Sequence, residues 1–392
     1  MKTKNLLMTA AIALSFVAPT QVFAEYGDDA YKERVALSKQ IKKMKNMRKQ
    51  LPSPPPAGLF GVYAFPEKGQ YVAGVNFQHH EFSGLLNGSN SVSATTAITS
   101  APNQFGNTIA VPNLKVVPNS AKANVILPFI NYTLNDKIAL VAMAPLIEKE
   151  SNMESFSVGL AGHPALNESV GKFTIKSKGL GDVKFGALYK AYNSEDNKHN
   201  VIIDAVLSAP TGSIEEADAQ IAPMTQPNKT VVGEFTTSRL GYGMQLGGGT
   251  WDAMVGAAYW GKSDKWGYGA QYLATIPLEN ENKNGWRFGD KHELTAWSSY
   301  SWEPTLVSSF RLRAEHQDEL HGLDPVLAAP GLGAQPGNYG GKIIEASVGV
   351  NYMYAPAKNI SIEYIAPISQ DRNGYQAEKD SAIAISWRNA FF

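Results

Sequence analysis

Hydrophobic and polar residues alternate with a period of two between Ile343 and Pro367. In the first half the apolar parity holds Ile344, Ala346, Val348, Val350, Tyr352 and Tyr354. The polar parity holds Glu345, Ser347, Gly349 and Asn351, and the alternation resumes after a turn at 355–358. Because successive side chains of a strand point to opposite faces, this pattern predicts a β-hairpin with one apolar wall and one polar wall.

The same pattern recurs along most of the chain. It predicts strands near 71–82, 124–134, 138–147, 181–192, 199–209, 238–247, 251–260, 267–277, 292–302, 307–317, 343–354, 360–368 and 380–391. About ten residues is the length that a tilted strand needs to cross a bilayer. Thirteen strands conflict with the even number of a bacterial barrel, so we expect twelve to fourteen. An even number would result from a further strand at 170–178, or from a different division of 247–291 into strands.

The connections fall into two length classes. Short turns are expected at 134–137, 247–250, 303–305 and 355–358. Long segments rich in Ser, Asn, Gly and Pro are expected as loops at 83–122, 148–178, 212–237 and 318–342. Short turns at one end and long loops at the other are typical of outer-membrane barrels. The predicted fold class is therefore an all-β, antiparallel transmembrane barrel with a short N-terminal periplasmic helix.

The first seventy residues are organised differently. A basic start, an apolar stretch from Leu6 to Ala18 and the sequence Val22-Phe23-Ala24 predict a signal peptide over 1–24, cleaved after Ala24. Residues 25–51 have acids early, bases late and a narrow apolar stripe, which predicts an amphipathic basic helix. This helix would lie on the periplasmic side, enter the lumen as a plug, or join protomers of a homo-oligomer through residues 30–51. A Pro-rich linker over 52–70 would separate it from a barrel over 71–392.

Composition narrows the partners and the chemistry. Lys and Arg number 35, as do Asp and Glu, so no net field favours a nucleic-acid partner. The chain has no cysteine, which removes disulfides, thiolate metal sites and cysteine nucleophiles. The apolar parity of the last strand ends on Phe391, beside the terminal Phe392, and this ending resembles the strand by which barrels are recognised. We expect outer-membrane lipid and the barrel-assembly machinery as partners, and the bacterial outer membrane as location.

In a membrane barrel the polar parity lines the lumen. The lumen-lining candidates are Asn76, Gln78, His80, Asp182, Lys184, Lys190, Asp204, Arg239, Glu293, Arg311, Arg313, Glu315, Glu345 and Glu363. Both signs of charge are present, which predicts a hydrated, mixed-charge interior. A soluble sandwich has the same period, but the signal peptide and strand lengths favour the barrel.

We expect no metal, no cofactor and no catalysis. His79 and His80 are adjacent, so on a strand they point to opposite faces and cannot chelate one ion together. Gly247-Gly248-Gly249 is followed by no predicted helix, so it is not expected to bind phosphate. The chain has neither a Gly-x-Ser-x-Gly elbow nor an HExxH motif.

Three blocks of residues resemble a known family. They are Lys178 to Tyr189, Gly243 to Asp252 and Gly285 to Trp297, with Ala209 to Gly212 in support. The family consists of outer-membrane proteins labelled as components of the MetA pathway of phenol degradation. The resemblance covers about 120–392 and implies a barrel similar to fatty-acid and aromatic-hydrocarbon channels, without catalytic residues.

The predicted function is a channel for small, hydrophobic or aromatic solutes. The long loops, with Phe105, Val111, Leu327 and Leu332, would form an apolar vestibule above a polar lumen. The alternatives are a general diffusion porin, a barrel without transport function, and a soluble periplasmic β-protein.

Overall fold

The structure is a computed structural model, and it describes residues 35, 37–39, 56–59, 68–106, 111–158, 167–223, 235–355 and 357–391. The chain divides into two compact units, Met1–Lys49 and Gln50–Phe392. In the first unit the described residues, Val35 and 37–39, are helical. The predicted signal peptide and most of the predicted helix over 25–51 lie outside the described residues.

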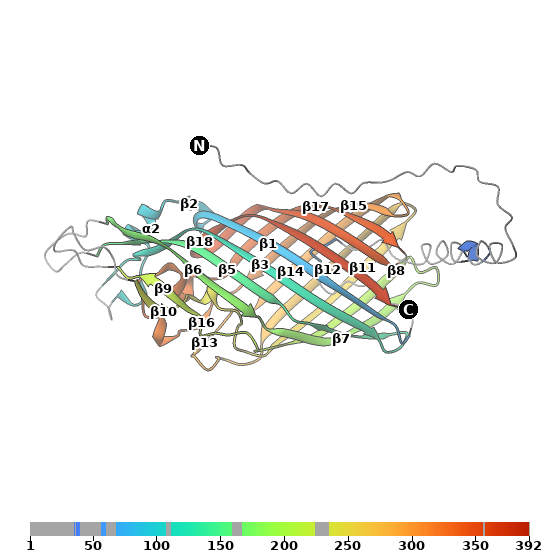
Figure 1. Cartoon of the computed structure of the whole chain (residues 1–392), viewed down its shortest axis with the longest axis horizontal. Helices are drawn as coiled ribbons and strands as arrows, with labels where there is room; N and C mark the ends of the chain where they lie inside the picture. Colours follow the sequence, from blue (N-terminus) through green and yellow to red (C-terminus); the bar gives the residue numbers. More distant parts are fainter. Residues whose placement is uncertain are drawn as a thin grey trace, which may run out of the picture. The chain divides into compact units, whose positions relative to one another are not determined.

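The second unit is built on one fourteen-stranded antiparallel sheet, whose order is β2-β1-β18-β17-β15-β14-β12-β11-β8-β7-β4-β3-β5-β6. An additional β1–β3 pairing closes the sheet into a barrel (Figure 1). The strands are β1 (Tyr71–Gly88), β2 (Asn90–Val92), β3 (Val116–Thr133), β4 (Ile138–Met143), β5 (Leu146–Phe156), β6 (Ser169–Leu180), β7 (Val183–Asn193), β8 (His199–Ala209), β11 (Asp252–Ser263), β12 (Trp266–Pro277), β14 (Lys291–Glu303), β15 (Leu306–Gln317), β17 (Gly341–Ala355) and β18 (Lys358–Phe391).

The longest strand element explains the parity of the barrel. From β1 round to β3 the closed ring holds eleven elements, yet a ring of antiparallel neighbours needs an even number. β18 is 34 residues long and pairs antiparallel with β17 as far as Arg372 and with β1 from Arg372 onward. It therefore reverses at about Gly374, whose φ of 55° suits such a turn. The wall has twelve legs, which confirms the predicted range of strands.

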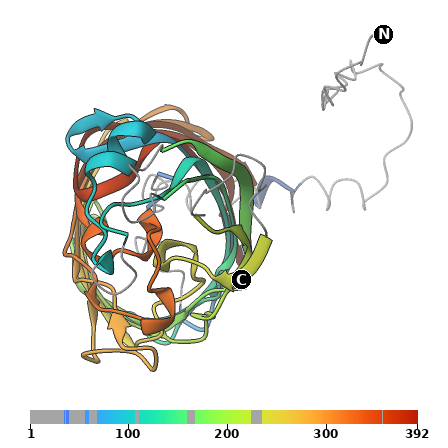
Figure 2. The same cartoon turned by 90° about the vertical axis from the view of Figure 1, so that its left-hand side faces the viewer.

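The smaller elements gather at the end of the barrel that carries the long connections (Figure 1). They are α2 (Ala94–Ser100), the pair β9 (Ala217–Ile221) and β10 (Phe235–Arg239), the pair β13 (Trp286–Arg287) and β16 (His321–Gly322), and the 3-10 turns η1 (Tyr242–Met244), η2 (Pro325–Leu327), η3 (Leu332–Ala334) and η4 (Pro336–Asn338). Viewed from this end, segments of the chain lie across the mouth of the ring (Figure 2). At the other end the legs are joined by short turns, so the predicted asymmetry is present.

The structure corrects several predicted elements. Much of 83–122 and 148–178, expected as loops, belongs to β1, β3, β5 and β6. Here the outward residues are charged and pair across strands, as Lys122 and Lys176 do with Glu150 at 3.1 and 3.0 Å, so the apolar signal is absent. The predicted strand 238–247 is wrong, because only its start belongs to β10 and η1 follows. The predicted turn 247–250 lies within the long segment between β8 and β11.

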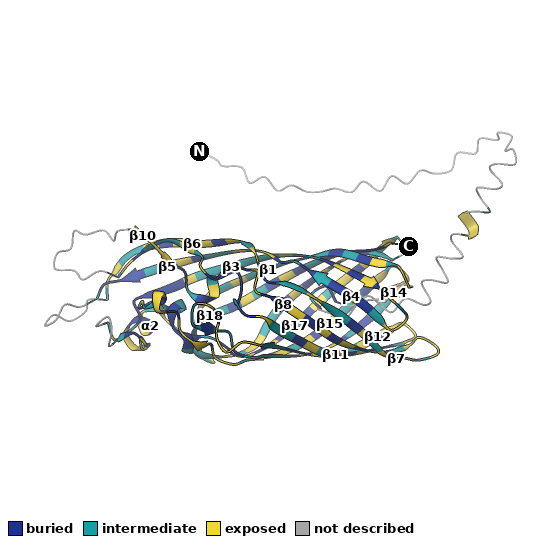
Figure 3. Ribbon diagram, turned by 90° about the horizontal axis from the view of Figure 1, so that it is seen from below, coloured by how far each residue is buried: buried dark blue, intermediate teal, exposed yellow. Residues whose placement is uncertain are grey.

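The register of four neighbouring strands marks the edge of an exposed apolar band. Phe77, Ile126, Leu146 and Leu180 form one cross-strand row. The next outward row toward the long loops is His79, Asn124, Glu148 and Lys178. Near the short turns the band ends on exposed aromatic rings, among them Tyr71, Tyr132, Tyr352, Trp387 and Phe391. Figure 3 shows exposed and buried residues alternating along the strands. Among the described residues, no helix is long and apolar enough to cross a membrane.

Candidate functional site

One half of the barrel interior is mainly apolar, although Asn131, Asn200 and Asp204 are also buried there. The inward side chains of β3, β4, β7, β8, β11 and β12 pack with single residues of β1, β14 and β18 into one buried cluster. Its members are Leu59, Val72, Phe129, Ala139, Val141, Met143, Leu188, Ile202, Val206, Met254, Ala258, Trp260, Leu273, Trp297 and Ala390. Several of these legs are apolar on both faces, since Ile203, Leu207, Val255 and Tyr259 are exposed on the outer surface. We name this inward surface the apolar half-wall.

The other half of the interior is charged. On β15, Arg311 bonds through Nε to Glu363 on β18 at 2.7 Å, and both side chains are buried. Arg313 lies at the centre of a larger cluster, with Glu293 at 2.6 Å, Glu345 at 2.5 Å and a close contact to Glu315. We name the inward surface of β14, β15, β17 and β18 the charged half-wall.

Two lysines complete the charged half-wall. Lys379 on β18 donates to Glu345 at 2.5 Å, and Lys291 on β14 lies 2.9 Å from Glu293. Each carboxylate therefore has at least one cationic partner, as buried charges require. Such networks are strongly destabilised when one partner is removed, because the other remains buried and unpaired.

A four-residue segment from the N-terminal side lies inside the barrel. We name Pro56–Leu59 the plug. The backbone N–H of Gly58 donates to Glu363 Oε2 at 2.7 Å, and Asn76 Nδ2 donates to the carbonyl oxygen of Ala57 at 2.5 Å. Leu59 is 4% exposed and packs into the apolar half-wall. The plug therefore bridges the two halves, although its residues belong to the stretch expected as a linker.

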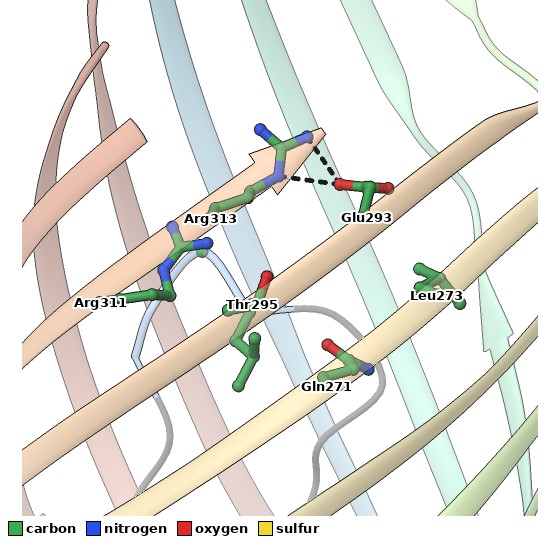
Figure 4. Close-up of a pocket in the computed structure, with 8 residues that line it drawn as sticks. Gln271, Leu273, Glu293, Thr295, Arg311 and Arg313 are labelled. Atoms are coloured by element: carbon green, nitrogen blue, oxygen red, sulfur yellow. Dashed lines mark hydrogen bonds and ion pairs between the residues drawn. The ribbon is translucent and has the colours of Figure 1, made fainter. Parts of the chain in front are cut away.

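A small cavity remains between the plug and the wall (Figure 4). It is lined by Gly58, Leu59, Gln271, Leu273, Glu293, Thr295, Arg311 and Arg313. Its volume is about 40 Å³, which is room for roughly three water molecules. This cavity by itself is therefore too small for an aromatic solute.

The barrel wall is weakest beside β6. Among the described strands, β6 is the last in the sheet order and pairs with β5 alone, because β8 ends at Ala209, level with Val183. Lys149 Nζ donates to the carbonyl oxygens of Gly243 at 2.9 Å and Gln245 at 2.6 Å. Ser177 Oγ donates to the carbonyl oxygen of Met244 at 2.6 Å. Beside β6, the side-chain hydrogen bonds to this loop take the place of the backbone ladder that joins neighbouring strands elsewhere in the wall.

An aromatic cluster lies among the long connections. Tyr242, Trp286, Phe288 and Tyr339 make edge-to-face ring contacts, with centroids 4.9 to 6.4 Å apart. The Tyr339 hydroxyl donates to the carbonyl oxygen of Gly333 and accepts from the N–H of Gly243. Burial raises the pKa of Tyr339 well above its usual range, so the hydroxyl stays neutral. This cluster ties 241–243 to 332–340 and rigidifies the mouth.

The structure places most predicted lumen residues on inward positions. Glu293, Arg311, Arg313, Glu315, Glu345 and Glu363 meet in the charged half-wall. Asn76, Gln78 and His80 face inward on β1, and His80 Nε2 lies 3.1 Å from Gln78 Oε1. Lys184 and Lys190 on β7 and Asp204 on β8 lie on legs of the apolar half-wall.

Two of the predicted residues are not on strands of the barrel. Asp182 lies between β6 and β7, where it accepts from the N–H groups of Gly212 at 2.9 Å and Gly248 at 2.8 Å. Arg239 lies on β10, outside the fourteen-stranded sheet, and bonds to Asp324 at 2.6 Å. The assignment of Arg239 to a strand of the wall is therefore corrected.

Sequence reasoning missed the apolar half-wall, because it assigned only polar residues to the interior. The signal was present in β11, where Asp252–Ser263 reads DAMVGAAYWGKS and is apolar on both parities. It also missed Lys379, which precedes the predicted last strand, and the plug.

The described residues hold no group of three or more metal-ligating side chains. His79 faces outward on β1 with Asn124 Oδ1 at 2.7 Å and Glu81 at 3.2 Å, whereas His80 faces inward. The two rings therefore lie on opposite faces of the strand.

No family model and no curated protein matches this chain. Among solved structures it is similar to the COG4313 outer membrane channel from Pseudomonas putida F1, with a TM-score of 0.52, 14% identity, and coverage of 86% of this chain and 100% of that one. A Pseudomonas aeruginosa FadL homologue gives a TM-score of 0.40 at 11% identity, covering 87% and 95%. The CymD monoaromatic hydrocarbon channel gives 0.40 at 10%, covering 83% and 89%. The first similarity establishes the fold, an outer-membrane-type β-barrel.

Proposed function

We propose that this protein is an outer-membrane channel for small, largely apolar solutes such as aromatic compounds. The observation that carries the proposal is the apolar lining inside the barrel, a buried cluster that includes Phe129, Val141, Val206 and Leu273. A water-filled pore for polar solutes gains nothing from such a surface, whereas an apolar solute gains about 25 cal/mol per Å² that it buries. The exposed apolar band and its aromatic edge support a membrane location.

The solute path would begin among the long loops or at the loop-closed part of the wall beside β6, and it would follow the apolar half-wall past the plug. The charged half-wall would act as a rigid brace, because its ions satisfy one another. The plug would keep the resting channel closed, as the small cavity beside it indicates. Degradation of phenol-like compounds is the setting that the sequence resemblance suggests.

The test compares two substitutions on neighbouring strands that both line the cavity. Leu273→Asn replaces an apolar residue of the cavity lining by a polar one, whereas Thr295→Asn replaces one polar residue of the lining by another. Uptake of a labelled aromatic solute is measured in a channel-deficient Gram-negative host that produces each variant. We expect Leu273→Asn to lower the uptake several-fold and Thr295→Asn to leave it near wild type. Equal uptake by both variants would contradict an apolar path.

A general diffusion porin is the second candidate. Its supporting observation is the charged half-wall, which a polar solute could follow. Liposome swelling separates the two, because a porin admits sugars at rates that depend on size, whereas a plugged apolar channel excludes them.

A further inference from the structure

One buried carboxylate stands apart from the charged cluster. Asp204 on β8 is 0% exposed and lies on the apolar half-wall, between Ile202 and Val206 on the same face. Its neighbours across the two adjacent strands are Leu188 on β7 and Gly256 on β11. Among the described residues its carboxylate makes no ion pair within 4.0 Å, unlike the glutamates of the charged half-wall.

The two oxygens of Asp204 differ in their contacts. Oδ2 accepts from Gln271 Nε2 on β12 at 3.2 Å. Oδ1 is buried and has no hydrogen-bond partner within the part of the chain that the structure describes. A buried acceptor that is left without a donor is destabilising, so its presence on an apolar surface calls for a reason.

The neighbouring strand is shaped around this carboxylate. A Cβ at Gly256 would lie 3.3 Å from Asp204 Oδ2 and 2.6 Å from the carbonyl oxygen of Tyr272. The absence of a side chain lets the carboxylate reach across β11 to Gln271. Gln271 in turn lines the cavity beside the plug (Figure 4). Asp204 and Gln271 thus form a polar position in the apolar half-wall, next to the space that the plug closes.

We propose that Asp204, with Gln271, is the anchor for the head group of the solute, and that this head group is an O–H or N–H donor on an apolar body. A donor satisfies Oδ1 while the apolar body lies on Leu188, Val206 and Leu273. A carboxylate solute is excluded by repulsion, and an ether or a hydrocarbon leaves Oδ1 unsatisfied. The proposal deepens the proposed function and rests on it, because the anchor is reached only by a solute inside the lumen.

The experiment is calorimetric titration of the full-length protein in lipid nanodiscs, with empty discs subtracted. The probes share one apolar body and are benzyl alcohol, benzylamine, benzyl methyl ether and benzoate. We expect wild type to bind the alcohol and the amine about tenfold more tightly than the ether, the factor of one buried hydrogen bond, and benzoate not measurably. Asp204→Leu should abolish the difference between alcohol and ether.

Asp204→Asn is the second variant, because it retains an acceptor and removes the charge. It should keep the preference for the alcohol and lose that for the amine, which separates the two kinds of donor. Asn200→Leu, four residues away on the same inward face of β8, is the matched control and should bind as wild type does. Heat-modifiable gel migration establishes that each variant is folded.

Equal affinity of wild type for alcohol and ether, or the same difference in folded Asp204→Leu, would overturn the anchor. Absence of binding in a protein that still carries the labelled aromatic solute into cells would overturn it as well. If wild type neither binds the probes nor carries that solute, the proposed function itself fails.

Discussion

Replacement of Gly58 by valine is expected to unseat the plug and open the lumen. A Cβ at this position would lie 2.8 Å from both Arg311 Nη2 and Glu363 Oε2. These two atoms belong to a buried ion pair, so they have little room to move apart. The larger valine side chain therefore displaces the backbone and breaks the hydrogen bond from the Gly58 N–H to Glu363.

The free energy that the plug gains from its contacts is of about the same size as the entropy cost of fixing its backbone. The hydrogen bond to the Glu363 carboxylate is worth about 1.5–3 kcal/mol and the bond from Asn76 about 0.5–1.5 kcal/mol. Burial of the Leu59 side chain adds about 1.5–3 kcal/mol. Fixing four residues costs about 4–8 kcal/mol of backbone entropy, which is of the same size. Loss of the Glu363 bond should therefore shift the equilibrium roughly ten- to hundredfold toward an open lumen.

Single-channel recording in planar bilayers measures this shift. Wild type should show a small conductance with brief openings, whereas Gly58→Val should be open most of the time. The matched control is Gly331→Val, where the nearest heavy atom to an added Cβ is 4.0 Å away. Identical open probabilities in wild type and Gly58→Val, in folded protein, would refute the assignment of Pro56–Leu59 as the closing segment.

Three further changes have defined outcomes. Arg311→Met should lower the free energy of unfolding in urea by about 3–5 kcal/mol, because Glu363 is left buried and unpaired; a loss below about 1 kcal/mol would contradict a buried pair. Val348→Arg, 57% exposed within the apolar band, should cost about 2–4 kcal/mol in lipid vesicles, and a neutral result would place this face outside the membrane. Lys149→Met removes two hydrogen bonds from the loop beside β6, so limited proteolysis within 240–251 should accelerate; an unchanged cleavage rate would show that other contacts hold this loop.

The fold could be predicted from the sequence wherever apolar outward residues alternate with polar inward residues. The hairpin from Ile343 to Pro367 is an example, since Val348, Val350 and Tyr364 are exposed while Glu345 and Glu363 are buried. The pattern failed where the outer face leaves the apolar band, because the strands β5 and β6 carry charges there. These strands have paired charges outside, and inside they alternate apolar residues such as Met153 and Phe173 with Ser and Gly, so the apolar signal of a membrane strand is weak.

Only half of the barrel interior could be predicted from the sequence. Charged residues at inward parity pointed to the cluster around Arg313, but parity alone does not say which of them meet across the barrel. The strands of the apolar half-wall are apolar on both faces. In the sequence such strands look like ordinary buried strands, so their apolar inner face was not recognised. The plug has no periodic signal, since among the described residues Pro56–Leu59 is held by one backbone N–H, one carbonyl oxygen and the buried side chains of Ala57 and Leu59.

The central claim is that an apolar track, closed at rest, runs through this barrel. Proteoliposome swelling tests it most directly, with wild-type protein and a series of sugars beside aromatic alcohols of similar size. The account predicts that sugars are excluded and that the aromatic solutes enter with a saturable rate. Rapid sugar entry at rates that rise linearly with concentration, without preference for the aromatic solutes, would contradict it.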